Sequence, residues 1–178
     1  MGTKPRPAVA RGRSRTPRTG PPFGGWRLKV ERLKSVCDEA KIDSLVKTAV
    51  LAELDGVEFL QGFDYATLCR EYNGIGPEWA GAPIRAKVTR YLSLFEPAAL
   101  AHDMRNYMSD GSREGFNYAN MEFHENCLKL ADHAYPWWNW RRYRARLVAH
   151  ALYDFVRGDG GWKAWQDCYE RNLFLKQQ

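Results

Sequence analysis

The sequence predicts an α+β fold, in which a small N-terminal antiparallel sheet precedes a helical core and an extended arm precedes both. Within residues 26–63, three runs have apolar residues at every second position, the period of a half-buried strand. After Pro97 they recur every three or four positions, the period of a helix. The first 25 residues are rich in Arg, Pro and Gly and offer little to bury. We therefore divide the chain into an arm (1–25), a sheet (26–63) and a helical core (64–178).

The arm carries the basic excess of the chain. The first 34 residues hold ten basic residues and one acidic residue, whereas the net charge of the whole chain is +6, so the remainder is slightly acidic. A segment of this composition is disordered when alone, and we expect a partner protein to hold it. Nucleic acid is the alternative partner, because arginines neutralise phosphates. The residues expected to bind the partner are Arg6, Arg11, Arg13, Arg15 and Arg18.

The predicted sheet rests on three alternating runs. Trp26, Leu28 and Val30 alternate with charged residues and indicate a first strand. Asp55-Gly56 separates two further runs, and this pair is a strong hairpin signal because both residues tolerate a positive φ. The alternative is a single helix from residue 42 to residue 54. Its apolar face would consist of Ile42, Leu45, Val46, Ala49 and Val50.

Helices are predicted for the rest of the core. The Gly- and Pro-rich segment 72–83 indicates a loop, Pro97 suits the first turn of the next helix, and Ser112 is placed to cap the helix after that. The buried stripe expected on this second helix is Phe116, Ala119, Asn120, Phe123, Cys127 and Leu130. A third helix, ending at the glycine run 158–161, is expected to bury Leu147, Val148, Ala151, Leu152 and Phe155.

His102 and Asp103 raise the main chemical question. His102 shares a helical face with Phe95 and Ala99, so we expect its ring to point inward. Asn120 interrupts the apolar stripe of the following helix, and a buried amide needs a hydrogen-bond partner. If the two helices pack antiparallel, His102 and Asn120 can meet. A polar partner that fixes the tautomer is what a histidine general base requires, and the alternative is a core histidine with satisfied hydrogen bonds.

Three segments of the core carry a family resemblance: YNGIGP, EPAALAHDMRNY and FNYANMEFHENCLK. They resemble the calcium-binding loop, the His-Asp helix and the second catalytic helix of phospholipase A2, above all in its compact parvovirus capsid version. This resemblance covers roughly residues 72–129. The segments GFDYAT, AALAHDMRNY, ANMEF and ALYDFVRGDGGWKAW are similar to a phage-borne family called domain of unknown function 1353. The wider resemblance implies a tailed-phage source.

The phospholipase resemblance implies a catalytic site on a phospholipase A2-like core. It makes His102 the base that activates water, with Asn120 behind it. Calcium would polarise the ester carbonyl. The calcium ligands that it implies are Asp103 and backbone carbonyls around Asn73, Gly74 and Gly76. The enzymes place an aspartate where this chain has Asn120, and an amide adds no charge to stabilise the imidazolium, so we predict a degenerate site.

Other chemistry has weaker support in the sequence. The segment PWWNWRRYRAR could stack and clamp nucleic acid, but such a run more often packs its tryptophans inward and leaves its arginines in solvent. His124, His133 and His150 do not share one helical face, and the four cysteines form no CxxC pair, so a zinc site is not predicted. No stretch approaches the roughly 18–20 apolar residues of a membrane helix.

We therefore expect a structural protein of a tailed-phage virion, made in the host cytoplasm and held to other virion proteins by its arm. It would have a phospholipase-like core with a degenerate site and no cofactor. One alternative is a calcium-dependent lipid ester hydrolase carried in the virion, with calcium as its cofactor. A further alternative is a packaging protein that contacts nucleic acid.

Overall fold

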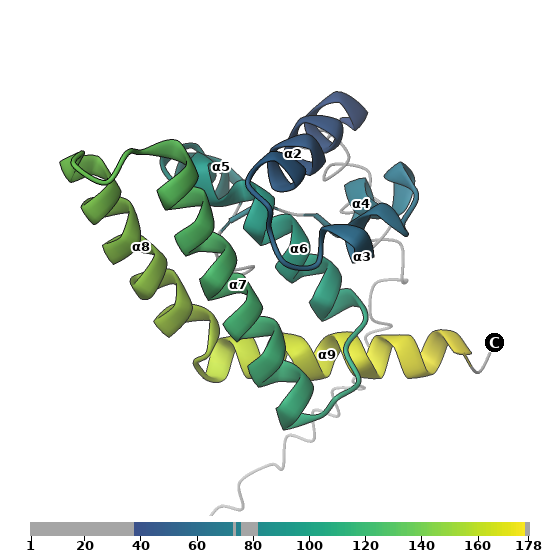
Figure 1. Cartoon of the computed structure of the whole chain (residues 1–178). Coiled ribbons are helices and arrows are strands. Elements are labelled where there is room, and N and C mark those ends of the chain that lie inside the picture. Colours follow the sequence, from purple (N-terminus) through teal and green to yellow (C-terminus); the bar gives the residue numbers. More distant parts are fainter. Residues whose placement is uncertain (1–37, 73, 76–81, 177–178) are drawn as a thin grey trace, which may run out of the picture. The chain divides into compact units, whose positions relative to one another are not determined.

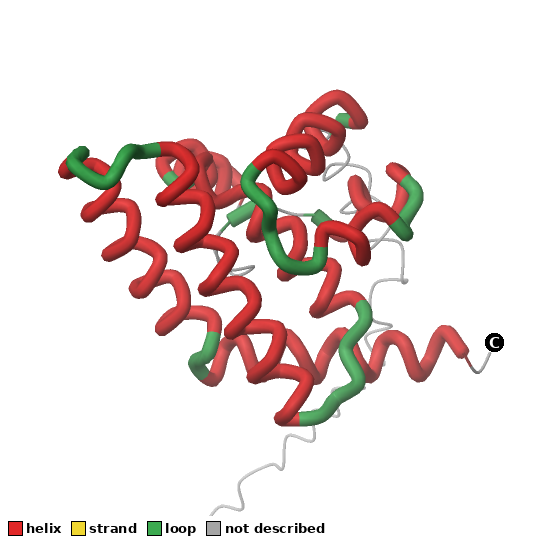
Figure 2. Tube along the Cα trace, viewed as in Figure 1, coloured by secondary structure: helices red, strands yellow, loops and turns green. Residues whose placement is uncertain are grey.

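The computed structural model describes residues 38–72, 74–75 and 82–176, which belong to one compact unit. The regular elements in these ranges are all helical (Figure 2). In chain order they are α2 (Glu39–Leu51), α3 (Val57–Gln61), α4 (Tyr65–Glu71), α5 (Ala82–Tyr91), the 3-10 helix η1 (Ser93–Phe95), α6 (Glu96–Tyr107), α7 (Arg113–Ala134), α8 (Trp140–Val156) and α9 (Asp159–Lys176).

The predicted α+β fold with an N-terminal sheet is wrong for the part of the chain that the structure describes, because α2 and α3 occupy the region assigned to strands. The alternation of apolar residues also fits a helical period. Ile42, Leu45 and Ala49 fall on one face of α2, where all three are buried. The helix that we considered as the alternative is therefore present. The predicted strand at 26–30 lies outside the described residues.

Local signals at both ends of α2 favour the helix over the strand. Asp38 caps its first turn by accepting a hydrogen bond from the backbone N–H of Lys41 at 2.7 Å. The predicted Asp55-Gly56 turn exists, but it joins two helices instead of two strands. Gly56 has a φ of 78°, and Glu53 has a φ of 50° at the start of the same connection. A positive φ thus marks a turn here without deciding which elements the turn connects.

Helix α6 lies at the centre of the described unit. It packs against α2, α4, α7 and α9 (Figure 1). Its first turns are buried almost all round: Ala98 and Leu100 are fully buried, and Ala101 is 2% exposed. The alanine side chains let the surrounding helices approach closely. The helical turn that precedes His102 is therefore fixed by packing on several sides.

The predicted starts of α6 and α7 are confirmed. Pro97 lies in the first turn of α6, where its missing N–H costs no hydrogen bond. Ser112 caps α7 by accepting a hydrogen bond from the backbone N–H of Gly115 at 2.9 Å. The buried stripe predicted for α7 is also confirmed. Its members are Phe116, Ala119, Asn120, Phe123, Cys127 and Leu130, none of them more than 4% exposed.

The buried face predicted for α8 is only partly right. The helix is present and ends at Val156, just before Gly158. Its fully packed residues are Ala145 and Ala149, with Val148 and Leu152 against the core. The predicted members that are exposed instead are Leu147, Ala151 and Phe155. Apolar residues lie on both sides of α8, and the side with small residues packs inward because it allows α7 and α8 to approach closely.

Candidate functional site

The structure brings His102 and Asn120 together, as the sequence predicted. His102 Nε2 lies 2.9 Å from Asn120 Oδ1, across the interface between α6 and α7. An amide oxygen can only accept a hydrogen bond, so Nε2 carries the proton and Nδ1 has the lone pair. Phe123 lies against the imidazole with a centroid distance of 4.9 Å. The ring is therefore held in one orientation and one tautomer.

The second ring nitrogen of His102 faces another amide. Asn106, one turn along α6, places its Nδ2 3.5 Å from His102 Nδ1. This contact is long for a hydrogen bond, but the amide stands next to the lone pair that a general base would use. Burial lowers the pKa of His102, although the hydrogen bond to Asn120 and the charge of Glu122 act in the opposite direction. The imidazole is accordingly neutral at pH 7.

Asn120 contributes less than the aspartate that the phospholipase resemblance would place there. It is 2% exposed, and its Nδ2 has no hydrogen-bond partner among the described residues. An unpartnered buried donor costs about 1–3 kcal/mol. The neutral amide orients the imidazole of His102, but it has no negative charge with which to stabilise a protonated ring. The two side chains are hydrogen-bonded, but no carboxylate stands behind the imidazole at this position.

The predicted calcium ligands are only partly described. Asp103 lies in α6 next to His102, whereas Asn73 and Gly76 lie outside the described residues. Gly74 is buried with a φ of 85°. The next residue, Ile75, uses both of its backbone groups: its N–H donates to Thr89 Oγ1 at 3.0 Å, and its carbonyl accepts from the same hydroxyl at 3.2 Å.

Calcium takes six to eight oxygen ligands, of which the described part of the loop offers few. Among the described residues, no group of three or more His, Cys, Asp or Glu side chains is arranged to hold a metal ion. The residues that the structure describes therefore do not offer enough oxygen ligands to hold calcium by themselves. The assignment of the calcium ligands stays a prediction. The arm residues expected to bind a partner, Arg6, Arg11, Arg13, Arg15 and Arg18, lie outside the described residues.

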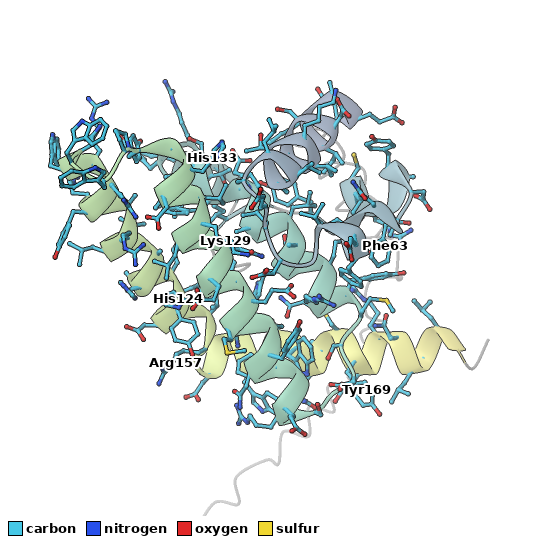
Figure 3. All side chains as sticks on the ribbon, viewed as in Figure 1. Phe63, His124, Lys129, His133, Arg157 and Tyr169 are labelled. Carbon is cyan, nitrogen blue, oxygen red and sulfur yellow. The ribbon has the colours of Figure 1, made fainter. Side chains whose placement is uncertain are left out.

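Sequence reasoning missed a polar row on α7 that holds the connection between α2 and α3. Asn126 Oδ1 accepts a hydrogen bond from the backbone N–H of Asp55 at 2.7 Å, and Asn126 Nδ2 donates to the carbonyl of Asp55 at 3.0 Å. One turn earlier, Glu122 forms a two-pronged ion pair with Arg105 of α6, at 2.9 and 2.7 Å. Lys129 of α7, which is labelled in Figure 3, forms an ion pair with Asp55, in which Nζ lies 2.6 Å from Oδ1. The signal available in the sequence was the spacing of Glu122, Asn126 and Lys129, which are four and three positions apart and therefore share one side of a helix.

A pair of histidines was also missed, because each lies on a different helix. His124 of α7 and His150 of α8 approach to 2.9 Å between Nε2 and Nδ1. The ring of Tyr153 stacks on His124 with a centroid distance of 4.6 Å and an interplanar angle of 25°. Burial and the neighbouring His150 lower the pKa of His124. The absence of a shared face on one helix did not exclude a pair formed by two helices.

The tryptophan-rich segment corrects another expectation. Its tryptophans do not pack inward: Trp137, Trp138 and Trp140 are 78%, 71% and 61% exposed. Trp137 and Trp138 lie in the turn between α7 and α8, and Trp140 begins α8. Two more exposed aromatic residues lie nearby: Tyr143, one turn along α8, and Tyr91, which lines the same hollow as Trp140. We call these five aromatic residues the aromatic corner.

A hollow of about 370 Å³ opens beside the aromatic corner. Leu92, Leu94, Phe95 and Val148 give it an apolar floor, and Trp140 forms part of its edge. Arg141 and Arg144 also line it. The guanidinium of Arg144 lies 5.2 Å from the ring centre of Trp140. The hollow therefore combines an apolar floor with an aromatic and cationic rim.

No described helix is both long enough and apolar enough to cross a bilayer, in agreement with the sequence prediction. Comparisons with family models, with curated proteins and with solved structures give no significant match to this chain.

Proposed function

We propose that this chain is a non-enzymatic assembly protein that docks onto partner proteins, in the tailed-phage virion that the sequence resemblance implies. The observation that carries the proposal is the aromatic corner. Its five aromatic side chains are exposed, and two of them, Tyr91 and Trp140, line a hollow with an apolar floor. Exposed aromatic side chains beside an apolar hollow are typical of an interaction site.

The composition of the corner suits a protein partner. Trp, Tyr and Arg are the residues that contribute most of the binding energy in protein interfaces, because they bury large areas and also form hydrogen bonds. Arg142 and Arg146 of α8 are paired with Asp132 at 2.7 and 2.8 Å. Arg141 and Arg144 have no ion pair among the described residues. These two charges favour a partner segment that carries carboxylates beside an apolar anchor.

The environment of His102 supports a structural role for this histidine. Its Nε2 bonds to a neutral amide, and a second amide stands 3.5 Å from its Nδ1. A calcium-dependent lipid hydrolase is the second candidate, and the specific observation in its favour is the contact between His102 and Asn120. We rank it lower because a developing imidazolium would have Asn120 instead of a carboxylate as its hydrogen-bond acceptor.

Site-specific photo-cross-linking in the producing cell tests the docking proposal. A benzophenone amino acid is placed at Trp138 of the full chain, and, in a matched control, at Tyr65, an exposed aromatic residue of α4. In Figure 1, α4 and α8 lie on opposite sides of α6. We expect one discrete cross-linked partner from position 138, weakened by Arg141→Glu and Arg144→Glu, and none from position 65. Equal labelling from both positions, or none from 138, would overturn the proposal.

An assay for lipid hydrolysis decides between the two candidates. The purified chain is mixed with anionic phospholipid vesicles in calcium, and released fatty acid is measured against His102→Ala. We expect the wild-type chain to release no more fatty acid than His102→Ala does. Asn120→Asp would restore the missing charge, and it is the variant expected to gain a trace of activity, because its geometry is already in place. Sustained wild-type release that His102→Ala eliminates would replace our proposal with the hydrolase.

A further inference from the structure

We propose that His124 and His150 form a binding site for a divalent transition-metal ion, which joins α7 to α8. The two rings come from neighbouring antiparallel helices, and His124 lies where α7 faces α8 (Figure 3). Neutral imidazole is the commonest protein ligand for zinc, copper and nickel. Two side chains supply the protein ligands, and solvent completes the coordination shell.

The separation of the two nitrogens agrees with chelation. His124 Nε2 and His150 Nδ1 are 2.9 Å apart. Two metal–nitrogen bonds of about 2.0–2.1 Å at a right angle place their nitrogens roughly 2.9 Å apart, whereas a tetrahedral angle requires about 3.3–3.4 Å. The pair therefore suits adjacent positions of a tetragonal or octahedral ion. This geometry favours copper(II) or nickel(II), with zinc after a small opening of the pair.

The proton count of the site is simple. In the metal-free pair, one of the two facing nitrogens carries a proton and donates it to the other. Metal binding needs a lone pair on both facing nitrogens. The donor ring meets this need by losing its proton from the facing nitrogen and taking one from solvent on its other nitrogen. A neutral pair thus binds the metal through a change of tautomer, with no net loss of protons.

The surroundings support a cation at this position. His150 is exposed, which gives an ion in solution access to the pair. Glu125 and Asp154 place negative charge near His124, and Arg146 is the opposing positive charge. Arg146 is bound to Asp132 at 2.8 Å, so its charge is largely compensated. Tyr153, stacked on His124, limits rotation of that ring. The ligands are therefore partly ordered before the metal binds.

Calorimetric titration of the full chain without an affinity tag tests the site. Copper(II), nickel(II), zinc and calcium are added separately to the wild-type chain, to His124→Ala, to His150→Ala and to His133→Ala. His133 is an exposed histidine of α7 outside the pair and provides the matched control. We expect one ion per chain, with copper bound most tightly and calcium not bound at this pair. Loss of a residue that only hydrogen-bonds to a metal ligand typically weakens metal binding by roughly 10–100-fold. Loss of either histidine of the pair, which is itself a ligand, should weaken binding by at least as much.

The midpoint of thermal unfolding provides a second readout. A metal that bridges α7 and α8 binds the folded chain more tightly than the unfolded chain, so it should raise the midpoint of the wild-type chain and of His133→Ala more than that of His150→Ala. His150 is exposed, so its replacement leaves the core intact. Copper binding of equal strength in the wild-type chain and in His150→Ala would overturn the proposal, as would no binding by the wild-type chain. Neither result bears on the aromatic corner, which is tested separately.

Discussion

Replacing Asn126 with alanine should destabilise the fold more than any change at the neighbouring exposed positions of α7. The Asn126 side chain is fully buried and bonds to both backbone groups of Asp55, at 2.7 and 3.0 Å. Alanine leaves the N–H and the carbonyl of Asp55 without these partners. An unsatisfied buried polar group costs about 1–3 kcal/mol, and the connection is partly open to water, so we expect a loss of about 2–4 kcal/mol in the free energy of unfolding. For a domain of this size, the melting temperature should fall by roughly 5–15 °C.

Urea unfolding followed by circular dichroism measures this loss. Asn126→Asp is the informative second variant, because it keeps an acceptor for the N–H of Asp55 but loses the donor to its carbonyl. Its free energy of unfolding should lie below that of the wild-type chain. Glu125→Ala, at an exposed position next to Asn126, is the matched control and should stay within about 0.5 kcal/mol of the wild type. If Asn126→Ala also stays within that range, α7 does not hold the turn in the way that we describe.

Three further predictions concern α6 and its connections. Because burial lowers the pKa of His102 below 6.5, unfolded chains bind a proton that folded chains do not, and the free energy of unfolding should fall as the pH drops below about 6.5. In urea titrations at several pH values, His102→Gln should reduce this pH dependence by up to about 1.4 kcal/mol per pH unit. Arg105→Met should lower the free energy of unfolding by about 2–4 kcal/mol, because it leaves the carboxylate of Glu122, whose side chain is 5% exposed, without its ion pair; an unchanged urea midpoint would contradict this. Gly111→Ala should cost more than the roughly 1–2 kcal/mol of a left-handed residue, because φ is 73° and the new Cβ would lie 2.6 Å from the ring of Tyr169; a melting temperature equal to that of the wild type would contradict it.

Much of the helical core was predictable because its signals are local. The cap at Ser112, the proline in the first turn of α6 and the apolar stripe of α7 depend on residues within a few positions of one another. The contact between His102 and Asn120 followed from these elements with one additional assumption, the antiparallel packing of α6 and α7. Local patterns therefore sufficed wherever one face of a helix is clearly apolar.

The N-terminal sheet was predicted wrongly because the deciding interactions are distant in the sequence. The residues of α2 satisfy a strand period and a helical period equally, and the Asp55-Gly56 turn suits either connection. What stabilises the observed turn is Asn126, 71 positions from Asp55. The outward orientation of Leu147 on α8 has a similar cause, since packing against α7 selects the face with small residues. Only the arrangement of the helices distinguishes these alternatives.

Three polar residues of α7, in the segment that resembles a catalytic helix, have partners on neighbouring elements of this fold. Asn120 bonds to His102 of α6, Asn126 holds the turn at Asp55, and His124 meets α8. These contacts offer a structural explanation of the pattern, beside the catalytic one. Because these side chains also pack the helices together, an alanine variant that loses activity has two explanations. It has lost either a catalytic group or part of the packing. A change that keeps a hydrogen-bonding group, such as His102→Gln, combined with a measurement of folding stability, separates them: a hydrolase would lose its activity while the fold stays intact, whereas a structural histidine would show only a change in stability.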